Sequence, residues 1–324
     1  MADPVLLTGS TGIVGNAIAQ ALIARGRLVR ALVRSVERAR KVVPEACELV
    51  PGDVTDPGSV ARAMAGCRVV YHAAGLPEQW FLDDGIFERV NVGGTRTMID
   101  AALVAGVERF VYTSTIDVFA WTPGRPFDES TIDPQPKGTA YERSKQAADR
   151  LVAEAMSRGL PAVFLHPSAV YGPIVAGSPG LNNLIADLVA GRTPMLLPGT
   201  MPVVCAPDVA VGHVVAETRP VGSRYILSES TWTLRDLARE VCAAAGGKRV
   251  PRVMPVWAAH ALASVGDVVA RVIRRPPLLP RGQLHFLESG ADPRADRART
   301  DLGWSPTSFR DALPATIAFV TASS

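Results

Sequence analysis

The chain has 324 residues, of which 48% are hydrophobic and 20% are charged, a balance typical of a globular protein rather than a disordered one. Its 34 basic and 31 acidic residues leave a net charge of +3, which is too small to indicate nucleic-acid binding. The four cysteines are far apart and lack both a CxxC pair and a nearby histidine at metal-ligand spacing. We therefore expect reduced thiols, no metal site and no nucleic-acid partner.

The N-terminus enters an apolar segment at once, without the basic start and cleavage site of a signal peptide. The longest apolar stretch near the C-terminus, residues 256–265, contains His260 and is too short to cross a bilayer. These features predict a cytoplasmic protein without an integral membrane segment. A chain of this length should form one large or two modest domains.

The first half of the chain alternates short, nearly continuous apolar runs with segments of helical periodicity. The expected strands are 5–8, 28–33, 47–50, 68–72 and 109–113, and the expected helices between them are 12–25, 36–42, 57–65 and 87–105. An amphipathic helix over 141–158 and a sixth strand over 162–166 follow. Such alternation predicts right-handed βαβ units and a doubly wound parallel sheet, the Rossmann type of α/β fold.

Beyond Tyr171 proline and glycine become frequent, and the expected helices 182–190 and 234–245 have no regular strand partners. We predict a dinucleotide-binding domain over 1–172, to which residues 203–245 return in part, through 203–216 and 225–227. Residues 173–202 and 246–324 should form a smaller, mixed substrate-binding domain. Within it we expect an ordinary packed helix over 255–275, with a lid and a membrane-surface helix as alternatives.

Residues 8–15, TGSTGIVG, stand between the first expected strand and the first expected helix. Glycines there permit a sharp turn, let the backbone approach a pyrophosphate and allow tight packing of helix on sheet. The free N–H groups and the positive dipole end at the helix start then bind phosphates. The sequence therefore predicts a dinucleotide site that includes Gly9, Ser10, Thr11, Gly12, Ile13 and Val14.

The end of the second expected strand indicates which dinucleotide is bound. An NAD site usually has a carboxylate there for the ribose 2′-hydroxyl, but this chain has Val33 and Arg34, with no acid before Glu37. A guanidinium forms charge-assisted hydrogen bonds with a 2′-phosphate. We therefore predict NADP(H), with contacts from Arg34, and keep NAD(H) as the second choice.

Tyr141 and Lys145 lie four residues apart and so share one face of the expected helix. Reduction of a ketone requires a proton for the developing alkoxide, and a phenol at its ordinary pKa is a slow donor. An ammonium group nearby would lower the pKa of Tyr141 toward neutrality. The pair predicts acid–base chemistry on an alcohol or a carbonyl group.

These motifs together resemble the extended short-chain dehydrogenase/reductase family over most of the chain. The matching segments are 8–15, 52–54 (GDV), 72–75 (HAAG), 91–95 (NVGGT), 141–145 (YERSK) and 166–173 (HPSAVYGP). The resemblance implies that Thr115, or its neighbour Ser114, bonds the substrate oxygen. It also implies that Lys145 bonds the nicotinamide ribose and Asp53 the adenine. The further cofactor-binding residues that it implies are Val54, Ala73, Ala74, Gly75, Asn91, Thr113, Tyr141, Pro167, Ala169 and Val170.

The family includes dehydratases, epimerases and reductases. Dehydratases carry acidic residues directly after the catalytic threonine, but Ile116 holds the first of these positions here and only Asp117 is acidic. Epimerases retain NAD, which fits Val33 and Arg34 poorly. Residues 201–213 instead resemble dihydroflavonol reductases, 3β-hydroxysteroid dehydrogenases and bacterial 3-ketoacid reductases.

The leading prediction is an NADPH-dependent reductase, or reversible dehydrogenase, of a ketone on a bulky and largely apolar substrate. Trp80, Phe81, Trp121 and residues 195–197 offer apolar surface for such a ligand, or belong to the core. The alternatives are an NAD-linked hydroxysteroid dehydrogenase, a nucleotide-sugar epimerase and a non-catalytic dinucleotide-sensing regulator. His166 stands where the family often has arginine, and we expect it to be structural. Relatives often pair through two long helices, so a homodimer is open as well.

Overall fold

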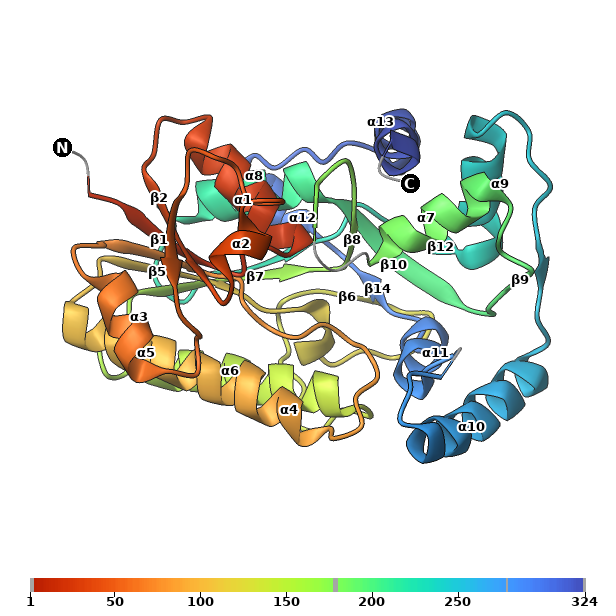
Figure 1. Cartoon of the computed structure of the whole chain (residues 1–324), viewed down its shortest axis with the longest axis horizontal. Coiled ribbons are helices and arrows are strands. Elements are labelled where there is room, and N and C mark those ends of the chain that lie inside the picture. The colour runs from red at the N-terminus through yellow and green to blue at the C-terminus, as the bar shows by residue number, and fades with distance from the viewer. Residues whose placement is uncertain (1–2, 177–179, 278, 323–324) are drawn as a thin grey trace.

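The computed structural model describes residues 3–176, 180–277 and 279–322. Its centre is a seven-stranded sheet with the order β11-β7-β5-β4-β1-β2-β3, in which all the pairings are parallel (Figure 1). The strands are β1 (Val5–Thr8), β2 (Val29–Val33), β3 (Glu48–Pro51), β4 (Val69–His72), β5 (Arg109–Thr113), β7 (Ala162–Pro167) and β11 (Arg224–Leu227). The chain order reverses between β1 and β4, and a doubly wound sheet opens its ligand crevice at such a point.

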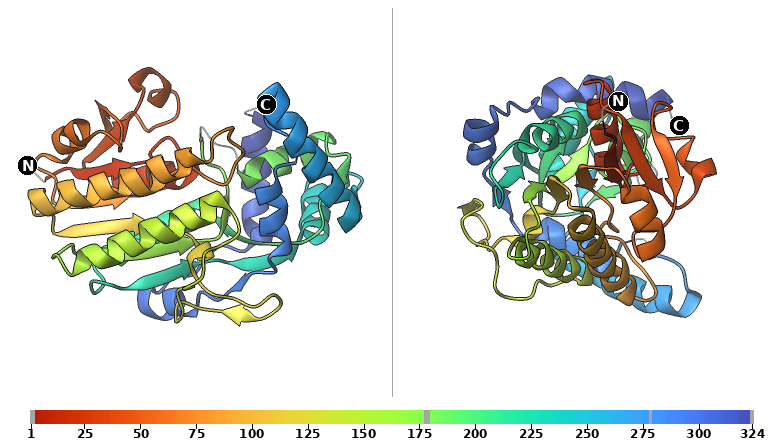
Figure 2. Two further views of the ribbon diagram at one scale, coloured as in Figure 1. Left: turned by 90° about the horizontal axis from the view of Figure 1, so that it is seen from below. Right: turned by 90° about the vertical axis from the view of Figure 1, so that its left-hand side faces the viewer.

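Helices cover both faces of this sheet, because successive residues of each buried strand point to opposite sides. Leu7 of β1 packs into one apolar core and Leu6 into the other. The first core lies under α1 (Ile13–Ile23), α2 (Val36–Ala39), α8 (Ala206–Ala216) and α12 (Asp296–Leu302), and the second under α3 (Pro57–Met64), α5 (Gly94–Ala105) and α6 (Ala140–Met156). Figure 2 shows the two layers on either side of the strands.

Smaller sheets build the C-terminal part, on the right of Figure 1. They are β12–β10–β8, from Ser230–Thr233, Thr200–Cys205 and Ala169–Tyr171; β13–β9, from Arg252–Val253 and Met195–Leu196; and β14–β6, from Asp292–Pro293 and Pro126–Phe127. A third core joins β10 to α7 (Leu181–Ala190), α9 (Leu234–Ala244) and α13 (Phe309–Ala322). Helices α10 (Val256–Ile273) and α11 (Arg281–Glu288) pack on each other at one edge.

The predicted fold class is confirmed, and β11 joins the large sheet beside β7, as expected for 225–227. Residues 203–216, expected to return to the large sheet, reach it in part only. β10 instead pairs with β8 and β12, and only α8, which follows it directly, reaches the large sheet, where it packs beside α1. The domain boundaries stay predictions, and residues 177–179 of the predicted substrate segment lie outside the described residues.

One helix differs from its expected extent. The single helix expected over 87–105 is a short α4 (Gly85–Phe87), a π-helical turn η1 (Glu88–Gly93) and α5. The helix expected over 255–275 is α10, and its apolar stretch runs past residue 265 to Ile273. Within the described part of the chain, α10 alone has the length and apolar composition of a membrane-crossing helix.

Candidate active site

The turn between β1 and α1 is closed by two glycines that no other residue could replace without movement. Gly9 has φ +77°, and a Cβ there would lie 2.5 Å from the Ala73 carbonyl oxygen at the end of β4. A Cβ on Gly15 would collide with the backbone of Gly9. The turn therefore packs directly against its own helix and against the next strand of the sheet.

Gly12 has a different part in the same turn. It precedes α1 in extended conformation, without a side-chain cap, and the nearest atom to a Cβ there would be the Gly9 oxygen at 3.4 Å. The buried Ser10 hydroxyl has no hydrogen-bond partner among the described residues. Free helix N–H groups, an open approach at Gly12 and an orphaned buried hydroxyl fit the pyrophosphate of a dinucleotide.

The adenine side of the crevice is formed by the ends of β2 and β3. Arg34 directly follows β2 and is exposed, and no ion pair to it occurs among the described residues. Asp53 follows β3, and its Oδ1 accepts hydrogen bonds from the Thr55 backbone at 2.9 Å and from the Thr55 hydroxyl at 2.8 Å. Val54 packs so closely on Gly94 that a Cβ at Gly94 would lie 2.8 Å from it. The hydrogen bonds from Thr55 thus fix the Asp53 carboxylate at the adenine side of the crevice.

Asn91, in the π-helical turn η1, holds the loop that follows β4. Its Oδ1 accepts from the Leu76 backbone at 2.7 Å, and its Nδ2 donates to the Leu76 carbonyl at 3.2 Å and to the Ser144 hydroxyl at 2.9 Å. The amide thus joins the segment after Gly75 to helix α6. Because its polar atoms bind protein groups, we propose that Asn91 supports the cofactor site by positioning this loop.

The predicted catalytic residues come together at the start of α6. A capping box between Thr139 and Glu142 fixes the beginning of this helix. Tyr141 lies in its first turn, with its hydroxyl near the side chain of Thr115. Lys145 is one turn further on, and its Nζ donates to the Thr113 carbonyl at 2.9 Å.

Ser114 and Thr115 point to different neighbours, which separates the two candidates for substrate binding. The Ser114 hydroxyl donates to Asp149 at 2.6 Å, and Asp149 also forms an ion pair with Arg224 at 2.8 Å. The Thr115 hydroxyl instead lies beside Tyr141. This geometry favours Thr115 as the residue that would bond the substrate oxygen. Ser114 instead connects the end of β5 to α6 through Asp149.

The electrostatics of Tyr141 differ from the expectation. Burial of the hydroxyl and the nearby Asp117 carboxylate raise the pKa of Tyr141 above its ordinary value, so the predicted lowering by Lys145 is wrong for the protein's own groups. Burial lowers the pKa of Lys145 to about 8, although Asp149 and Asp117 act in the opposite direction. The positive charge of Lys145 is therefore lost at a lower pH than that of an exposed lysine.

Two carboxyl groups beside Tyr141, the buried Asp117 and the partly buried Glu78, were not predicted as site residues. Asp117 Oδ2 accepts a hydrogen bond from Thr115 at 2.7 Å, its Oδ1 has no partner among the described residues, and burial raises the pKa of Asp117 to about 6. Glu78 accepts from the Thr139 hydroxyl at 2.9 Å, and burial raises the pKa of Glu78 to about 7. Only the position of Asp117 just after Thr115 could have signalled either one from the sequence.

Helix α11 closes against these acidic groups from the C-terminal part. A Cβ on Gly282 would collide with the Glu78 carboxylate, and a Cβ on Gly138 would lie 2.6 Å from His285 Nε2. The same imidazole nitrogen is 3.5 Å from the carboxylate of Glu142. More than 130 residues separate these partners along the chain, so no local pattern predicts the contact.

His166, expected to be structural, is fully buried. Its Nδ1 lies 3.1 Å from the Thr115 carbonyl and its Nε2 lies 3.4 Å from the Arg224 guanidinium. Burial, together with Arg224, holds the pKa of His166 well below its usual range, so the ring is neutral, donates from Nδ1 and accepts at Nε2. The Nδ1–H of His166 therefore holds the backbone carbonyl of Thr115 in place from within the core.

Aromatic rings extend from Tyr141 toward the proposed substrate side. The Phe87 ring is 6.1 Å from the Tyr141 ring, and Phe81 packs edge-on against Phe87 at 5.2 Å. Trp121 stacks on Phe127 at 5.3 Å under the Lys137 ammonium, and Leu196 is a core residue. Of the predicted apolar surface, Phe81 is thus the residue linked to the catalytic group through ring contacts.

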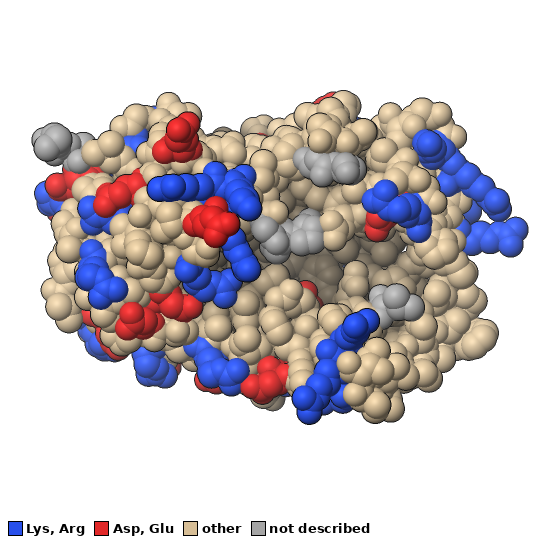
Figure 3. Space-filling model, in the orientation of Figure 1, with Lys and Arg blue, Asp and Glu red and all other residues tan. Residues whose placement is uncertain are grey.

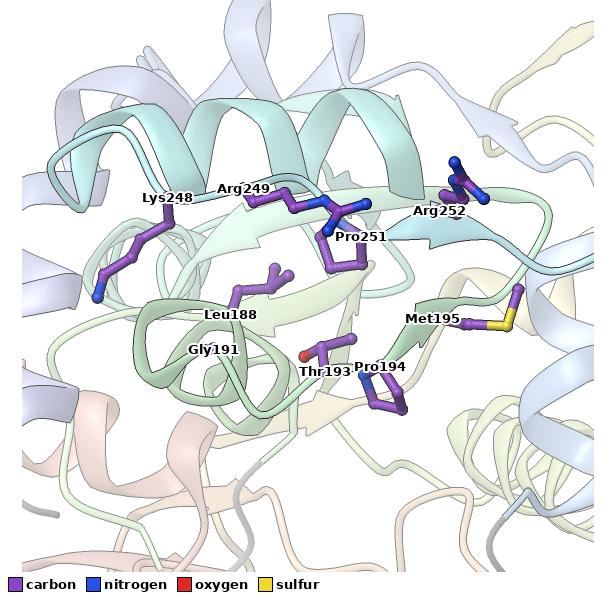
Figure 4. Close-up of a pocket in the computed structure, with 9 residues that line it drawn as sticks. All are labelled: Leu188, Gly191, Thr193, Pro194, Met195, Lys248, Arg249, Pro251 and Arg252. Atoms are coloured by element: carbon purple, nitrogen blue, oxygen red, sulfur yellow. The ribbon is translucent and has the colours of Figure 1, made fainter.

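The space-filling view shows a hollow between the large sheet and the C-terminal part (Figure 3). A separate cavity of about 590 Å³ lies within the C-terminal part, with Lys248, Arg249 and Arg252 along one side and Met195 and the end of α7 along the other (Figure 4). None of the residues lining that cavity belongs to the catalytic set.

A family model and several relatives match most of the chain. A model of the NAD dependent epimerase/dehydratase family matches residues 5–224. Sterol demethylase protein B of Methylococcus capsulatus is 30% identical over 322 residues, which cover 97% of this chain and 97% of that protein. The 4-hydroxy-2-methyl-3-oxo-4-farnesyl-3,4-dihydroquinoline-1-oxide ketoreductase of Stigmatella aurantiaca is 32% identical, over 92% of this chain and 91% of that one.

Solved structures show the same fold. The crystal structure of gox2253 matches with a TM-score of 0.85 and 31% identity over 99% of both chains. The UDP-glucose 4-epimerase of Thermus thermophilus, in complex with NAD, matches with a TM-score of 0.78 and 24% identity over 99% of this chain and 100% of that one. With the family match and the reductase relatives, these findings identify the chain as a member of the extended short-chain dehydrogenase/reductase family and as an oxidoreductase that uses a nicotinamide dinucleotide.

Proposed function

We propose that the protein reduces a ketone on a bulky, largely apolar substrate with NADPH, and that Tyr141 supplies the proton. The observation that carries this proposal is the proximity of the Tyr141 hydroxyl to the Thr115 side chain, one helical turn from Lys145. When a substrate carbonyl is bound, the Thr115 hydroxyl can turn from Asp117, so that both hydroxyl groups donate to one substrate oxygen. Two such donors would stabilise the negative charge that develops on this oxygen during reduction.

The dinucleotide, when bound, supplies the hydride that adds to the carbonyl carbon. Thr115 and Tyr141 orient the carbonyl oxygen, and the Tyr141 hydroxyl gives its proton to that oxygen as the alkoxide forms. The raised pKa of Tyr141 keeps the phenol protonated at neutral pH. This protonation state suits a donor in reduction better than a base in oxidation.

We also assign Lys145 a part in this chemistry. Its contact with the Thr113 carbonyl holds the ammonium at the end of β5, on the same helix face as Tyr141. From there it can donate to a ribose hydroxyl of the cofactor, the role that we propose for it. The proton that Tyr141 loses is replaced from solvent through the polar groups around it.

The preference for NADPH rests on the exposed Arg34 at the end of β2, where no carboxylate follows the strand. An arginine can bind a 2′-phosphate bidentately. The apolar substrate class rests on Phe81 and Phe87 beside Tyr141. It also agrees with relatives named as a ketoreductase of a farnesylated compound and as 2-alkyl-3-oxoalkanoate reductases.

The proposal is tested with Tyr141→Phe in an assay of NADPH oxidation over a panel of apolar ketones. We expect a loss of at least about 100-fold in kcat, the usual scale of a general acid, with NADPH affinity changed less than about threefold. Tyr225→Phe is the matched control, because Tyr225 lies in the core. Equal turnover by Tyr141→Phe and the unaltered enzyme would contradict the mechanism.

A further inference from the structure

Helix α10 has the reverse of the usual pattern of a surface helix, which turns large apolar side chains inward. Its buried side is a narrow seam of small residues, Ala259, Ala263 and Ala270, with Gly266 partly buried beside them. Ala259 and Ala263 pack on Leu284 of α11. The large apolar side chains of the helix point away from the protein.

Exposed large apolar side chains are concentrated on this helix. Half of the sixteen among the described residues lie on its 18 residues. They are Val256, Trp257, Leu262, Val265, Val268, Val269, Val272 and Ile273. Trp257, Val265 and Val272 are 75%, 65% and 78% exposed. At about 100° per residue, all but Val256 fall with Ala258 and Ala261 on one uninterrupted arc of roughly 160°.

The end of α10 carries positive charge. Arg274 and Arg275 follow its last turn, both are exposed, and no ion pair to them occurs in the described ranges. Arg271 is also exposed and contacts Asp267 at 3.4 Å. Arg274 has φ +54°, the one positive φ of a non-glycine residue in the described chain, at a cap position where glycine is usual. The backbone at this cap is strained, and the residue that forms the cap is a cation at the end of the apolar arc.

An anionic bilayer surface matches both features. An exposed apolar arc enters the boundary between headgroups and acyl chains, tryptophan favours that depth, and arginines bind anionic headgroups. A folded protein partner would instead need a groove that is apolar along the length of α10 and acidic at the end that meets the arginines. Figure 3 shows the region over α10 with little charge apart from basic side chains at its border.

We propose that α10 docks the protein on anionic lipid bilayers, with the helix lying in the plane of the surface. It does not cross the bilayer, because both ends are held by the fold. Met254, before the helix, donates its backbone N–H to the Leu196 carbonyl at 2.8 Å, and Leu279, after it, is buried against the α10 seam. A spanning helix would have to leave these contacts and expose the seam to lipid.

The docking surface adjoins the active site. α10 packs on α11, which contacts Glu78 through Gly282 and Glu142 through His285. Docking would therefore bring the site close to the membrane surface, where apolar compounds partition. Lipid binding itself does not rest on the proposed function, and its test uses no substrate.

The test is co-sedimentation of the full chain with phosphatidylcholine vesicles at about physiological ionic strength. One set of vesicles contains about 30% phosphatidylglycerol and the other contains none. We expect binding to the anionic vesicles and at least tenfold weaker partitioning for the triple variant Val265→Glu, Val268→Glu and Val272→Glu. Arg274→Gln with Arg275→Gln should remove the preference for anionic over neutral lipid. Val104→Glu is the matched control, because Val104 is 91% exposed on α5.

The variants change exposed side chains, so melting temperatures should stay within a few degrees of the unaltered protein. Light scattering after size exclusion tests the main competing occupant, a second copy of the chain. A dimer that the triple variant dissociates, without vesicle binding by the unaltered protein, would overturn the proposal. So would equal binding to anionic vesicles by the unaltered protein and the triple variant.

Discussion

The hydroxyl of Thr115 donates a hydrogen bond to the carboxylate of Asp117 over 2.7 Å, while the same side chain contacts Tyr141. A buried acid is thereby linked through one threonine to the proposed proton donor. Its other oxygen, Oδ1, has no hydrogen-bond partner in the described part of the chain. A site arranged for stability alone would not leave a buried carboxylate so poorly satisfied.

This link predicts that Asp117 makes the protein less stable as the pH rises. The pKa of Asp117 is raised from 3.8 to about 6, so between these values the folded chain binds more protons than the unfolded chain. Asp117 therefore contributes stability below about pH 4 that is lost as the pH rises through about 6. In Asp117→Asn this loss, of up to about 3 kcal/mol, should be absent.

The measurement is the free energy of unfolding in urea from pH 4 to pH 7.5 for both proteins. The asparagine keeps an acceptor for Thr115, so the fold should persist. Identical pH slopes in the two proteins would show that the Asp117 carboxyl group does not titrate in this range as described.

The glycine turn gives a prediction that separates folding from cofactor binding. Gly15→Ala places a Cβ against the backbone of Gly9 and should destabilise the protein by about 1–3 kcal/mol, the usual scale of overpacking. Gly12→Ala meets only the Gly9 oxygen at 3.4 Å and should leave the melting temperature almost unchanged. It should still weaken NADPH binding at least tenfold, because the methyl group occupies the approach to the helix N-terminus.

Thermal melts and fluorescence titration with NADPH test this pair of variants. Full NADPH affinity in Gly12→Ala would exclude the turn as the pyrophosphate site. Unchanged stability in Gly15→Ala would show that the turn can move away from α1.

Arg34 should determine the preference between the two dinucleotides. Arg34→Glu replaces a group that binds a 2′-phosphate by one that repels it, so NADPH affinity should fall by about 10- to 100-fold while NADH affinity is kept. Arg25→Glu makes the same charge change at the far end of α1 and is the control. If Arg34→Glu weakens both dinucleotides equally, Arg34 does not contact the 2′ position, and NAD(H) becomes the better assignment.

The ammonium of Lys145 predicts an alkaline limit to cofactor binding. Because the pKa of Lys145 is lowered to about 8, its positive charge is present below this pH and lost above it. NADPH affinity should therefore decrease as the pH rises from 7 to 9.5. Titrations across this range should show the decrease in the unaltered protein and not in Lys145→Met, which should bind weakly throughout. The same decrease in both proteins would assign it to another group.

The local parts of the fold and of the site could be predicted from the sequence. Strand β5 has the predicted bounds, Arg109–Thr113, because a buried parallel strand is a continuous apolar run between recognisable turns. Tyr141 and Lys145 share a helix face as their spacing requires. Their protonation could not be predicted, because burial and Asp117 act on Tyr141 through tertiary structure. The contact of His285 with Glu142 likewise depends on how distant segments pack.

Strand β11 has a consequence for how this protein can be recombined with its relatives. The chain leaves the large sheet after β7, builds β8, α7 and β10, and returns through α8 and β11 to complete the sheet edge. A chimaera joined at one point after β7 would take this edge strand from the donor and set it against a foreign β7. Exchange of substrate regions therefore requires junctions on both sides of the returning segment, so specificity is inherited in two separate pieces of the gene.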